Sequence, residues 1–243
     1  MAAAFLTRLP MPAGAGTTGF GRAARWFPLV GAGLGGITAV AAWGLDLAAV
    51  PPPLAAWLLV GFCAWITGGL HLDGLADVAD GFGGGRSRED VLRIMRDPSI
   101  GAFGATALLV LLGIKAGALT ALLERDAAIP VLVAAPVLAR WTAVALGSWL
   151  PSARPDGGLG DTVTRSAGRA GLVVASSVTA AVVVAALRVD GLVLWILAAL
   201  VTAVLGRATR RRIGGVTGDV FGAGVELTET TVLVGAVLLR AHA

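Results

Sequence analysis

Three aspartates, Asp73, Asp77 and Asp80, have the residue type and spacing that most directly suggest chemistry in this sequence. On a helix, their i, i+4, i+7 spacing turns the three carboxylates toward one side, within about 60° of one another. Like charges on one face repel, and a hard divalent cation between them removes the repulsion. Mg²⁺ is usually held by a few carboxylates together with phosphate oxygens of a substrate. The pattern therefore predicts a catalytic magnesium site, with a solvated acidic helix face as the alternative.

A second acidic set lies near the C-terminal end, at Asp219, Glu226 and Glu229. Asp219 and Glu226 are again seven residues apart, and Gly222 and Ala223 lie between them on the same side of a helix. A face without bulk in its middle allows another helix or a ligand to approach closely. Carboxylates within a span are functional candidates, and we assign Glu226 to substrate binding. Alternatively, Glu226 and Glu229 pair with buried cations and serve only the structure.

Two cations lie deep within apolar stretches, Lys115 and Arg140. An unpaired charge in such a stretch costs several kcal/mol, so these residues are functional candidates. Arg binds a phosphate through two parallel hydrogen bonds, and Lys acts on it as a point charge. Carboxylates for a metal together with buried cations favour phosphoryl or nucleotidyl transfer, and we assign both residues to substrate binding. For Lys115, a purely structural role is the alternative.

Three further polar residues flank the aspartates. His71 is a candidate base or orienting group for a substrate hydroxyl, although a lone histidine at a helix end also commonly serves the structure. Arg96 and Asp97, which we assign to substrate binding, precede the turn-rich segment 98–104. The backbone amides of this segment would open the following helix and bind phosphate there.

The composition shows which elements must carry these residues. Of the 243 residues, 56% are hydrophobic and 14% are charged, whereas a soluble domain carries about 25% charged residues. The mean hydropathy is +0.84. These values exclude an ordinary soluble domain and a disordered chain. The net charge of +4 would suit a nucleic-acid-binding protein, but the arginines lie between apolar runs and the chain has no tyrosine, so we expect no nucleic-acid partner.

Apolar runs long enough to cross a membrane occur seven times, which predicts an all-α, polytopic bundle of about seven transmembrane helices. The expected spans are 27–50, 53–72, 101–123, 128–150, 169–187, 190–206 and 215–239. Most arginines fall in the N-terminal arm and in the alternate connections that would share its side of the membrane. Because basic residues gather on the cytoplasmic side, we expect a cytoplasmic N-terminus and a site that faces the cytoplasm.

A short amphipathic helix is expected between the second and third spans. The segment 87–90 has the spacing of a helix N-cap, and Val91, Ile94 and Met95 then share one helical face. Such a helix would lie on the inner membrane surface. Because no repeat or domain boundary is evident, residues 1–243 are expected to form a single integral membrane domain.

In these residues the sequence resembles the cobalamin synthase family of integral membrane enzymes, the adenosylcobinamide-GDP ribazoletransferases. The aspartate motif and the Gly-Gly-Val-Thr-Gly-Asp motif are the specific parts of the resemblance. The motifs follow in order along the chain: Phe5-Leu-Thr-Arg-Leu-Pro10, Phe27-Pro-Leu-Val-Gly31, Gly68 to Gly81, Ile94-Met-Arg-Asp97, Ile100 to Gly104, Gly158-Leu-Gly160, and Gly214 to Asp219 with Glu226. One departure is Pro98-Ser99 after Asp97, where the family often has serine followed by a basic residue.

The resemblance implies a Mg²⁺-dependent reaction in a bacterial inner membrane. A hydroxyl of α-ribazole, or of its 5′-phosphate, would attack the cobinamide-side phosphate of adenosylcobinamide-GDP, and GMP would leave. The resemblance further implies that the four aspartates hold the metal and that three cations neutralise the diphosphate. The residues concerned are Asp73, Asp77, Asp80 and Asp219 for the metal, and Arg96, Lys115 and Arg140 for the diphosphate.

Two other functions compete with this hypothesis. A membrane alcohol phosphotransferase of another class would also use aspartates and Mg²⁺, but we would expect Asp-Gly-x-x-Ala-Arg, and Asp73-Gly-Leu-Ala-Asp77 lacks the arginine. An ion-coupled transporter would use the buried charges as a relay. No inverted repeat is evident, and the acidic residues gather toward one membrane boundary instead of the midplane.

Overall fold

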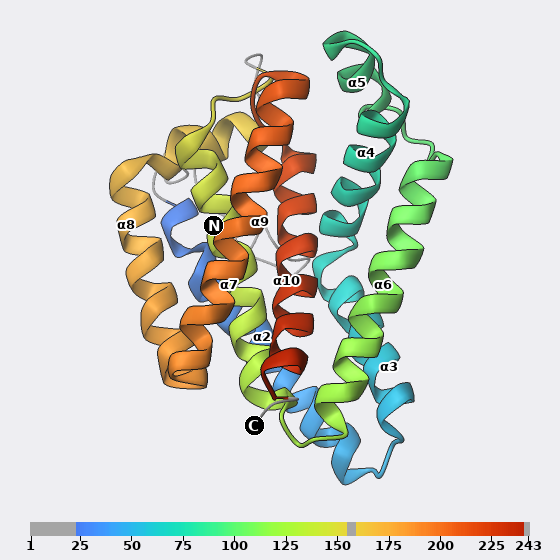
Figure 1. The fold of residues 1–243 in the computed structure, drawn as a ribbon, viewed down its shortest axis with the longest axis vertical. Helices are drawn as coiled ribbons and strands as arrows, with labels where there is room; N and C mark the ends of the chain where they lie inside the picture. The colour runs from blue at the N-terminus through green and yellow to red at the C-terminus, as the bar shows by residue number, and fades with distance from the viewer. Residues whose placement is uncertain (1–22, 155–158, 241–243) are drawn as a thin grey trace, which may run out of the picture.

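The computed structural model describes residues 23–154 and 159–240. The N-terminal arm with its Phe5 to Pro10 motif, and Gly158, lie outside these residues. A 3₁₀ turn, η2 (Ala24–Trp26), leads into the helices. These are α2 (Phe27–Leu47), α3 (Pro52–Thr67), α4 (Leu70–Gly84), α5 (Arg88–Ile94), α6 (Ala102–Leu123), α7 (Ala128–Trp149), α8 (Leu159–Leu187), α9 (Val189–Ile213) and α10 (Gly218–Arg240). The long helices lie side by side along one axis, with α5 near one end and the last turn of α10 near the other (Figure 1).

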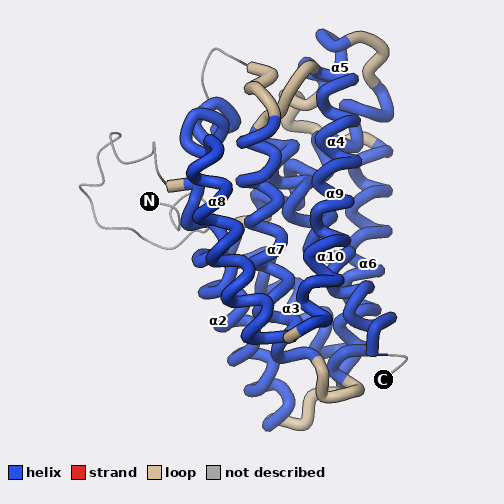
Figure 2. The backbone as a smooth tube through the Cα atoms, turned by 60° about the vertical axis from the view of Figure 1, so that its left-hand side comes forward, coloured by secondary structure: helices blue, strands red, loops and turns tan. Residues whose placement is uncertain are grey.

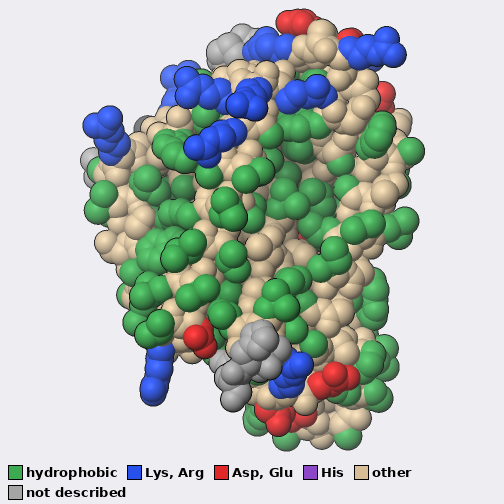
Figure 3. Space-filling view, viewed as in Figure 1, with side chains coloured by type: hydrophobic (Ala, Val, Ile, Leu, Met, Phe, Trp, Pro, Cys, Tyr) green, Lys and Arg blue, Asp and Glu red, His purple; other side chains and the backbone are tan. Residues whose placement is uncertain are grey.

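The prediction of an all-α, polytopic membrane bundle is confirmed. In the described part of the chain, six helices are long and apolar enough to cross a membrane, and the bent pair α3 and α4 brings the number to as many as seven. The connections gather at the two ends of the bundle (Figure 2). Hydrophobic side chains cover the middle of the visible face, while arginine side chains gather at the upper end (Figure 3). Trp65 and Leu109 are 70% and 75% exposed, which suits a surface that faces lipid.

The second expected span, 53–72, is wrong in its C-terminal part. Helix α3 ends at Thr67, and Gly68 and Gly69 follow with φ of 67° and 71°. Residues with a side chain rarely adopt this left-handed backbone, so the two glycines allow the chain to leave one helix and start another. The axes of α3 and α4 differ by 91°. The aspartate motif therefore belongs to its own helix, α4.

The two spans expected at 169–187 and 190–206 differ from the helices of the structure mainly at their ends. The span expected to start at 169 coincides with a break at Gly168, where φ is 44° inside α8. The span expected to end at 206 continues as α9 to Ile213, and its last turn carries Arg210, Arg211 and Arg212. Hydropathy does not predict these charged last turns of α9, because a helix can extend beyond the apolar layer of the membrane.

The short helix α5 forms as the N-cap pattern predicts. The backbone N–H of Asp90 donates a hydrogen bond to Ser87 Oγ at 3.1 Å. Val91 and Met95 are 1% and 2% exposed, because Met95 packs where a side chain at Gly81 of α4 would lie. The apolar side of α5 is thus packed against α4, not against lipid.

Helices α7 and α10 form the centre of the bundle. Helix α7 packs against α2, α8, α9 and α10, and α10 packs against α4, α6, α7 and α9. The contact of α2 with α7 is close because Gly31 lies against the carbonyl of Pro136. Polar residues on α7 and α10 therefore end up inside the protein.

Candidate active site

Helices α4 and α10 touch backbone to backbone at two glycines. A Cβ atom added to Gly74 would lie 2.7 Å from the carbonyl oxygen of Asp219, and one added to Gly222 would lie 3.2 Å from the carbonyl oxygen of His71. The close approach expected at Gly222 is thus found, and the approaching element is α4. This contact places Asp219 beside the helix turn that carries Asp73 and Asp77.

Replacing Gly74 by alanine is therefore expected to push α4 away from α10. Because the nearest atoms belong to the Asp219 backbone, which cannot rotate away, the added methyl group should lower the free energy of unfolding by about 1–3 kcal/mol. We expect the separation of the carboxylates to lower the catalytic rate by at least about 10-fold. Thermal unfolding in detergent and an activity assay measure the two effects. In the control Gly61→Ala the new Cβ meets nothing within 4 Å, and a loss of activity as large in the control would contradict this explanation.

Asp73 and Asp77 line an open cleft with a volume of about 670 Å³ between α4, the end of α5 and the start of α6. Neither carboxylate makes a hydrogen bond or an ion pair within 4 Å among the described residues. Arg96 and Asp97 line the same cleft. The structure thus brings together four of the residues selected from the sequence, with two carboxylates open to a ligand.

Asp97 is held in a defined orientation at the edge of this cleft. The backbone N–H of Ser99 donates a hydrogen bond of 2.9 Å to Asp97 Oδ1. This bond lowers the pKa of Asp97 below its ordinary value, because a hydrogen bond to the ionised form stabilises that form. Asp97 therefore carries a negative charge at neutral pH at the edge of the cleft that Arg96 also lines.

Asp80 is engaged elsewhere, at the N-terminus of α6. Its two carboxylate oxygens accept hydrogen bonds from the backbone N–H groups of Gly101 at 2.7 Å and Gly104 at 2.8 Å. A carboxylate is favourable there because the first amides of a helix have no partner within the helix. Two of the amides of segment 98–104 that were expected to bind phosphate, those of Gly101 and Gly104, are thus already paired with Asp80. A metal-binding role of Asp80 stays a prediction.

Asp219 is held by two neighbours at the start of α10. Thr217 Oγ1 donates a hydrogen bond to Asp219 Oδ2 at 3.1 Å, and Arg154 Nη1 lies 3.4 Å from the same oxygen. Nothing in the local sequence marks Arg154 as a site residue, because its partner lies 65 residues away along the chain. The loop that carries Arg154 is fixed by a hydrogen bond of 2.8 Å from Ala153 N–H to the carbonyl of Val216.

The carboxylates do not form a ready-made metal centre. In residues 23–154 and 159–240, no group of three or more His, Cys, Asp or Glu side chains lies close enough to hold a metal ion. Asp80 instead binds helix α6, and Asp219 binds Arg154. Two open carboxylates, Asp73 and Asp77, are nevertheless enough for Mg²⁺, which is often held by one or two carboxylates, water and substrate phosphates.

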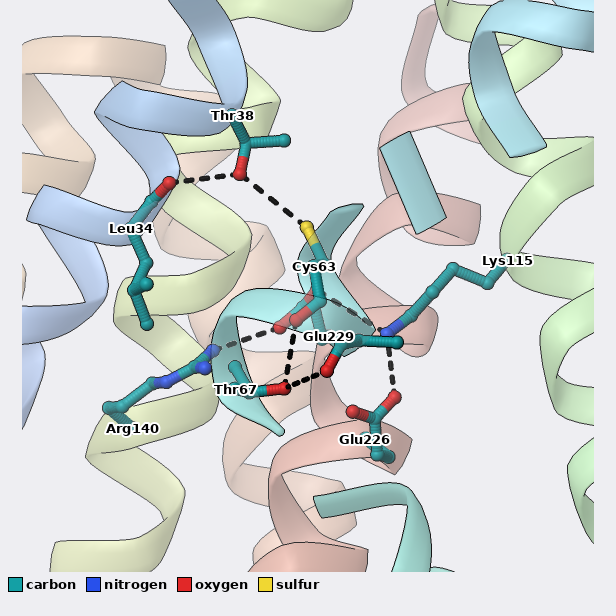
Figure 4. Close-up of polar contacts among 9 residues, drawn as sticks. Leu34, Thr38, Cys63, Thr67, Lys115, Arg140, Glu226 and Glu229 are labelled. Carbon is teal, nitrogen blue, oxygen red and sulfur yellow. Dashed lines mark hydrogen bonds and ion pairs between the residues drawn. The ribbon is translucent and has the colours of Figure 1, made fainter. Parts of the chain in front are cut away.

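The buried cations form ion pairs with the second acidic set (Figure 4). Lys115 Nζ lies 2.6 Å from Glu226 and 3.4 Å from Glu229, and Arg140 Nη1 lies 2.9 Å from Glu229. All four side chains are at most 13% exposed. We call Lys115, Arg140, Glu226 and Glu229 the ion-pair cluster. Its two positive and two negative charges balance, so the alternative in which the glutamates pair with buried cations is found, and substrate binding by Lys115, Arg140 and Glu226 stays a prediction.

His71 lies on the other side of α4 from the cleft. It is two positions before Asp73, which turns its side chain by about 200° around the helix. The side chain is 4% exposed and lines a cavity of about 30 Å³ beside the ion-pair cluster. The structure thus does not bring His71 into the cleft with Asp73 and Asp77, and its predicted role as a base has no support from this arrangement.

The fold and the site define a class: multi-pass α-helical membrane proteins with an acidic cleft at one end of the bundle. The chain belongs to the cobalamin-5-phosphate synthase family, whose family model matches residues 1–237. A protein of Pelodictyon phaeoclathratiforme named adenosylcobinamide-GDP ribazoletransferase is 43% identical to this chain. The alignment covers 97% of this chain and 94% of that protein.

Two other relatives carry the same name. The protein of Chlorobium phaeobacteroides is 43% identical over 96% of this chain and 94% of its own length. That of a Roseiflexus species is 40% identical over 94% of this chain and 85% of its own length. No solved structure matches the chain significantly.

Proposed function

We propose that this protein is an adenosylcobinamide-GDP ribazoletransferase. A hydroxyl of α-ribazole, or of its 5′-phosphate, attacks the cobinamide-side phosphate of adenosylcobinamide-GDP. A new O–P bond forms, the P–O bond to GMP breaks, and the hydroxyl proton passes to a base. Relatives with this name that are 40% to 43% identical over nearly the full length support the proposal. The observation that carries it is the cleft that two open carboxylates, Asp73 and Asp77, line together with Arg96.

The residues of the cleft suit the binding of a diphosphate. Asp73 and Asp77 are the residues that would hold Mg²⁺, which when bound supplies positive charge to neutralise the transferring phosphate. Arg96 is placed to donate hydrogen bonds to phosphate oxygens. Leu70, Leu108 and Ile100 line the same cleft and offer an apolar surface to the organic part of a substrate. Catalysis of this kind depends mainly on positioning and charge.

The proposal includes an orientation in a bacterial inner membrane with the cleft on the cytoplasmic side. The last turn of α9 carries three arginines at the end of the bundle where arginine side chains gather in Figure 3. Such residues are enriched on the cytoplasmic side of membrane proteins.

A cysteine at position 89 would report this orientation. Glu89 on α5 is an exposed residue, with a 78% exposed side chain, and Cys63 is the single native cysteine. In a Cys63→Ser background, we expect a Glu89→Cys variant to react with an impermeant maleimide in inverted membrane vesicles but not in intact spheroplasts. Labelling in intact spheroplasts would contradict the orientation.

The reaction itself is tested by GMP release from purified protein in detergent. We expect GMP only when adenosylcobinamide-GDP, α-ribazole and Mg²⁺ are all present, and we expect EDTA to abolish release and added Mg²⁺ to restore it. Omitting each substrate in turn separates transfer from hydrolysis. No GMP from protein with a cooperative thermal unfolding transition would contradict the proposed function, and release unchanged by EDTA would contradict the metal requirement alone.

A further inference from the structure

Two buried nitrogen atoms beside the ion-pair cluster have no hydrogen-bond partner in the described part of the chain. They are His71 Nε2 and Arg140 Nε, and their residues are 4% and 3% exposed. Buried polar atoms are nearly always paired with protein or with ordered water, because an unpaired one loses the hydrogen bonds that it makes to water in the unfolded chain. Two unpaired nitrogen atoms whose residues line the same cavity point to a ligand that both atoms share.

The cavity that these residues line decides the size of that ligand. His71 and Arg140 line a cavity of about 30 Å³ together with Thr67, Glu226 and Glu229. A water molecule needs about 10–15 Å³ of such volume and makes about three hydrogen bonds when buried. The cavity therefore fits one or two water molecules and no organic substrate. Its polar lining offers both donors and acceptors, whereas a cavity that stays dry is apolar.

We propose that a water molecule bound in this cavity joins His71 to Arg140, and that His71 is thereby a positioning residue for Asp73. The Arg140 guanidinium donates a hydrogen bond to the water from Nε, while its Nη1 binds Glu229 at 2.9 Å. His71 Nε2 forms the second hydrogen bond of the water. A continuous polar connection then runs from α4 through the water to α7 and α10.

Helix α4 needs such a connection at its start. It begins after Gly68 and Gly69. Its N-cap residue is Gly69, which has no side chain that could bind the first backbone amides of the helix. The backbone of His71 lies against Gly222 of α10, which holds the two helices close together at this residue. A hydrogen bond to the His71 ring adds a second fixed point, and together the two contacts fix the rotation of α4 about its axis. Asp73 lies two residues further on and faces the cleft, so this rotation sets the direction of its carboxylate. This second part of the inference rests on the proposed function, while the water site does not.

Histidine-selective ¹⁵N NMR tests the water site without any assay of activity. The chain has two histidines, His71 and His242, so a His242→Gln variant in detergent or nanodiscs leaves a single set of ring signals. We expect the Nε2 nitrogen of His71 to have the chemical shift of a hydrogen-bonded ring nitrogen and the ring to show magnetisation transfer from a bound water. The shift of a free ring nitrogen, with no transfer from water, would overturn the water site.

Two substitutions of His71 test the positioning role. In His71→Gln an amide reaches about the place of Nε2, whereas His71→Phe keeps a ring without nitrogen. We expect the Gln variant to keep kcat/KM within about 10-fold of the wild type, and the Phe variant to lose at least about 100-fold, with similar thermal midpoints. Equal and complete loss in both variants would mean that the imidazole acts on the reacting atoms, and would overturn the positioning role.

These outcomes are distinct from failure of the proposed function. A wild-type protein that releases no GMP contradicts the proposed function, while the NMR result still decides the water site. A wild-type protein that turns over, and a Phe variant with the same kcat/KM, would contradict the positioning role alone.

Discussion

Replacing Asp73 by asparagine is expected to lower the rate of GMP release by at least about 1,000-fold, because a metal-binding charge worth several kcal/mol in the transition state is lost. The amide keeps the size of the carboxylate, and within residues 23–154 and 159–240 the carboxylate accepts no hydrogen bond that the change would break. The fold should therefore survive. Initial rates over a range of Mg²⁺ concentrations measure the effect, with thermal unfolding as the test of folding.

Two other aspartates provide the controls for this prediction. Asp90 is exposed on α5 and pairs with Arg93 at 3.3 Å, so Asp90→Asn removes a charge at the same end of the bundle without touching the cleft and should retain activity. Asp80→Asn should instead lower the thermal midpoint, because Asp80 accepts the hydrogen bonds from Gly101 and Gly104. Turnover by Asp73→Asn at the wild-type rate in saturating Mg²⁺ would contradict the metal role.

Replacing Glu229 by leucine is expected to lower the free energy of unfolding by about 3–5 kcal/mol, the usual cost of removing one member of a buried ion pair. Glu229 is the partner of Arg140 at 2.9 Å and a second partner of Lys115 at 3.4 Å. Its loss leaves an excess of positive charge among apolar helices, where water cannot compensate. Reversible unfolding in mixed micelles, or the thermal midpoint where unfolding is irreversible, measures the effect.

A charge-neutral double substitution is the matched control for the ion-pair cluster. Lys115→Met and Glu226→Met together remove the pair at 2.6 Å and leave Glu229 with Arg140. The double variant should be more stable than either single variant, because neither single change keeps the charge balance. If Lys115 and Arg140 served mainly to bind substrate, single variants would fold normally and only KM would rise. That result would contradict the structural role of the cluster.

Much of the fold could be predicted from local patterns. The apolar runs predict the long helices because each run is about as long as the bilayer is thick. The spacing of Asp73 and Asp77 predicts a shared helix face, and both carboxylates line one cleft. The N-cap at Ser87 is found as expected. These features depend on residues less than two turns apart, or on hydropathy alone, so the sequence contains them directly.

Other features depend on which helices pack together, and the sequence alone left them open. Lys115 and Glu226 are 111 residues apart, and Asp80 binds the first turn of α6 from 21 and 24 residues away. In a membrane, hydropathy places every span in the same apolar layer and does not choose its neighbours. That choice depends on close backbone approach, as at Gly74 and Gly222.

The sequence by itself thus determined the helical membrane fold and the helix that carries the aspartates. The tertiary structure decided the partner of each charged group: Asp73 and Asp77 stay open to a ligand, Asp80 binds α6, and Asp219 binds Arg154. It also placed Lys115 and Arg140 in neutral ion pairs and His71 away from the cleft. The physical reason is that periodicity and hydropathy act along the chain, whereas hydrogen bonds and ion pairs form only between atoms that packing brings within about 3–4 Å.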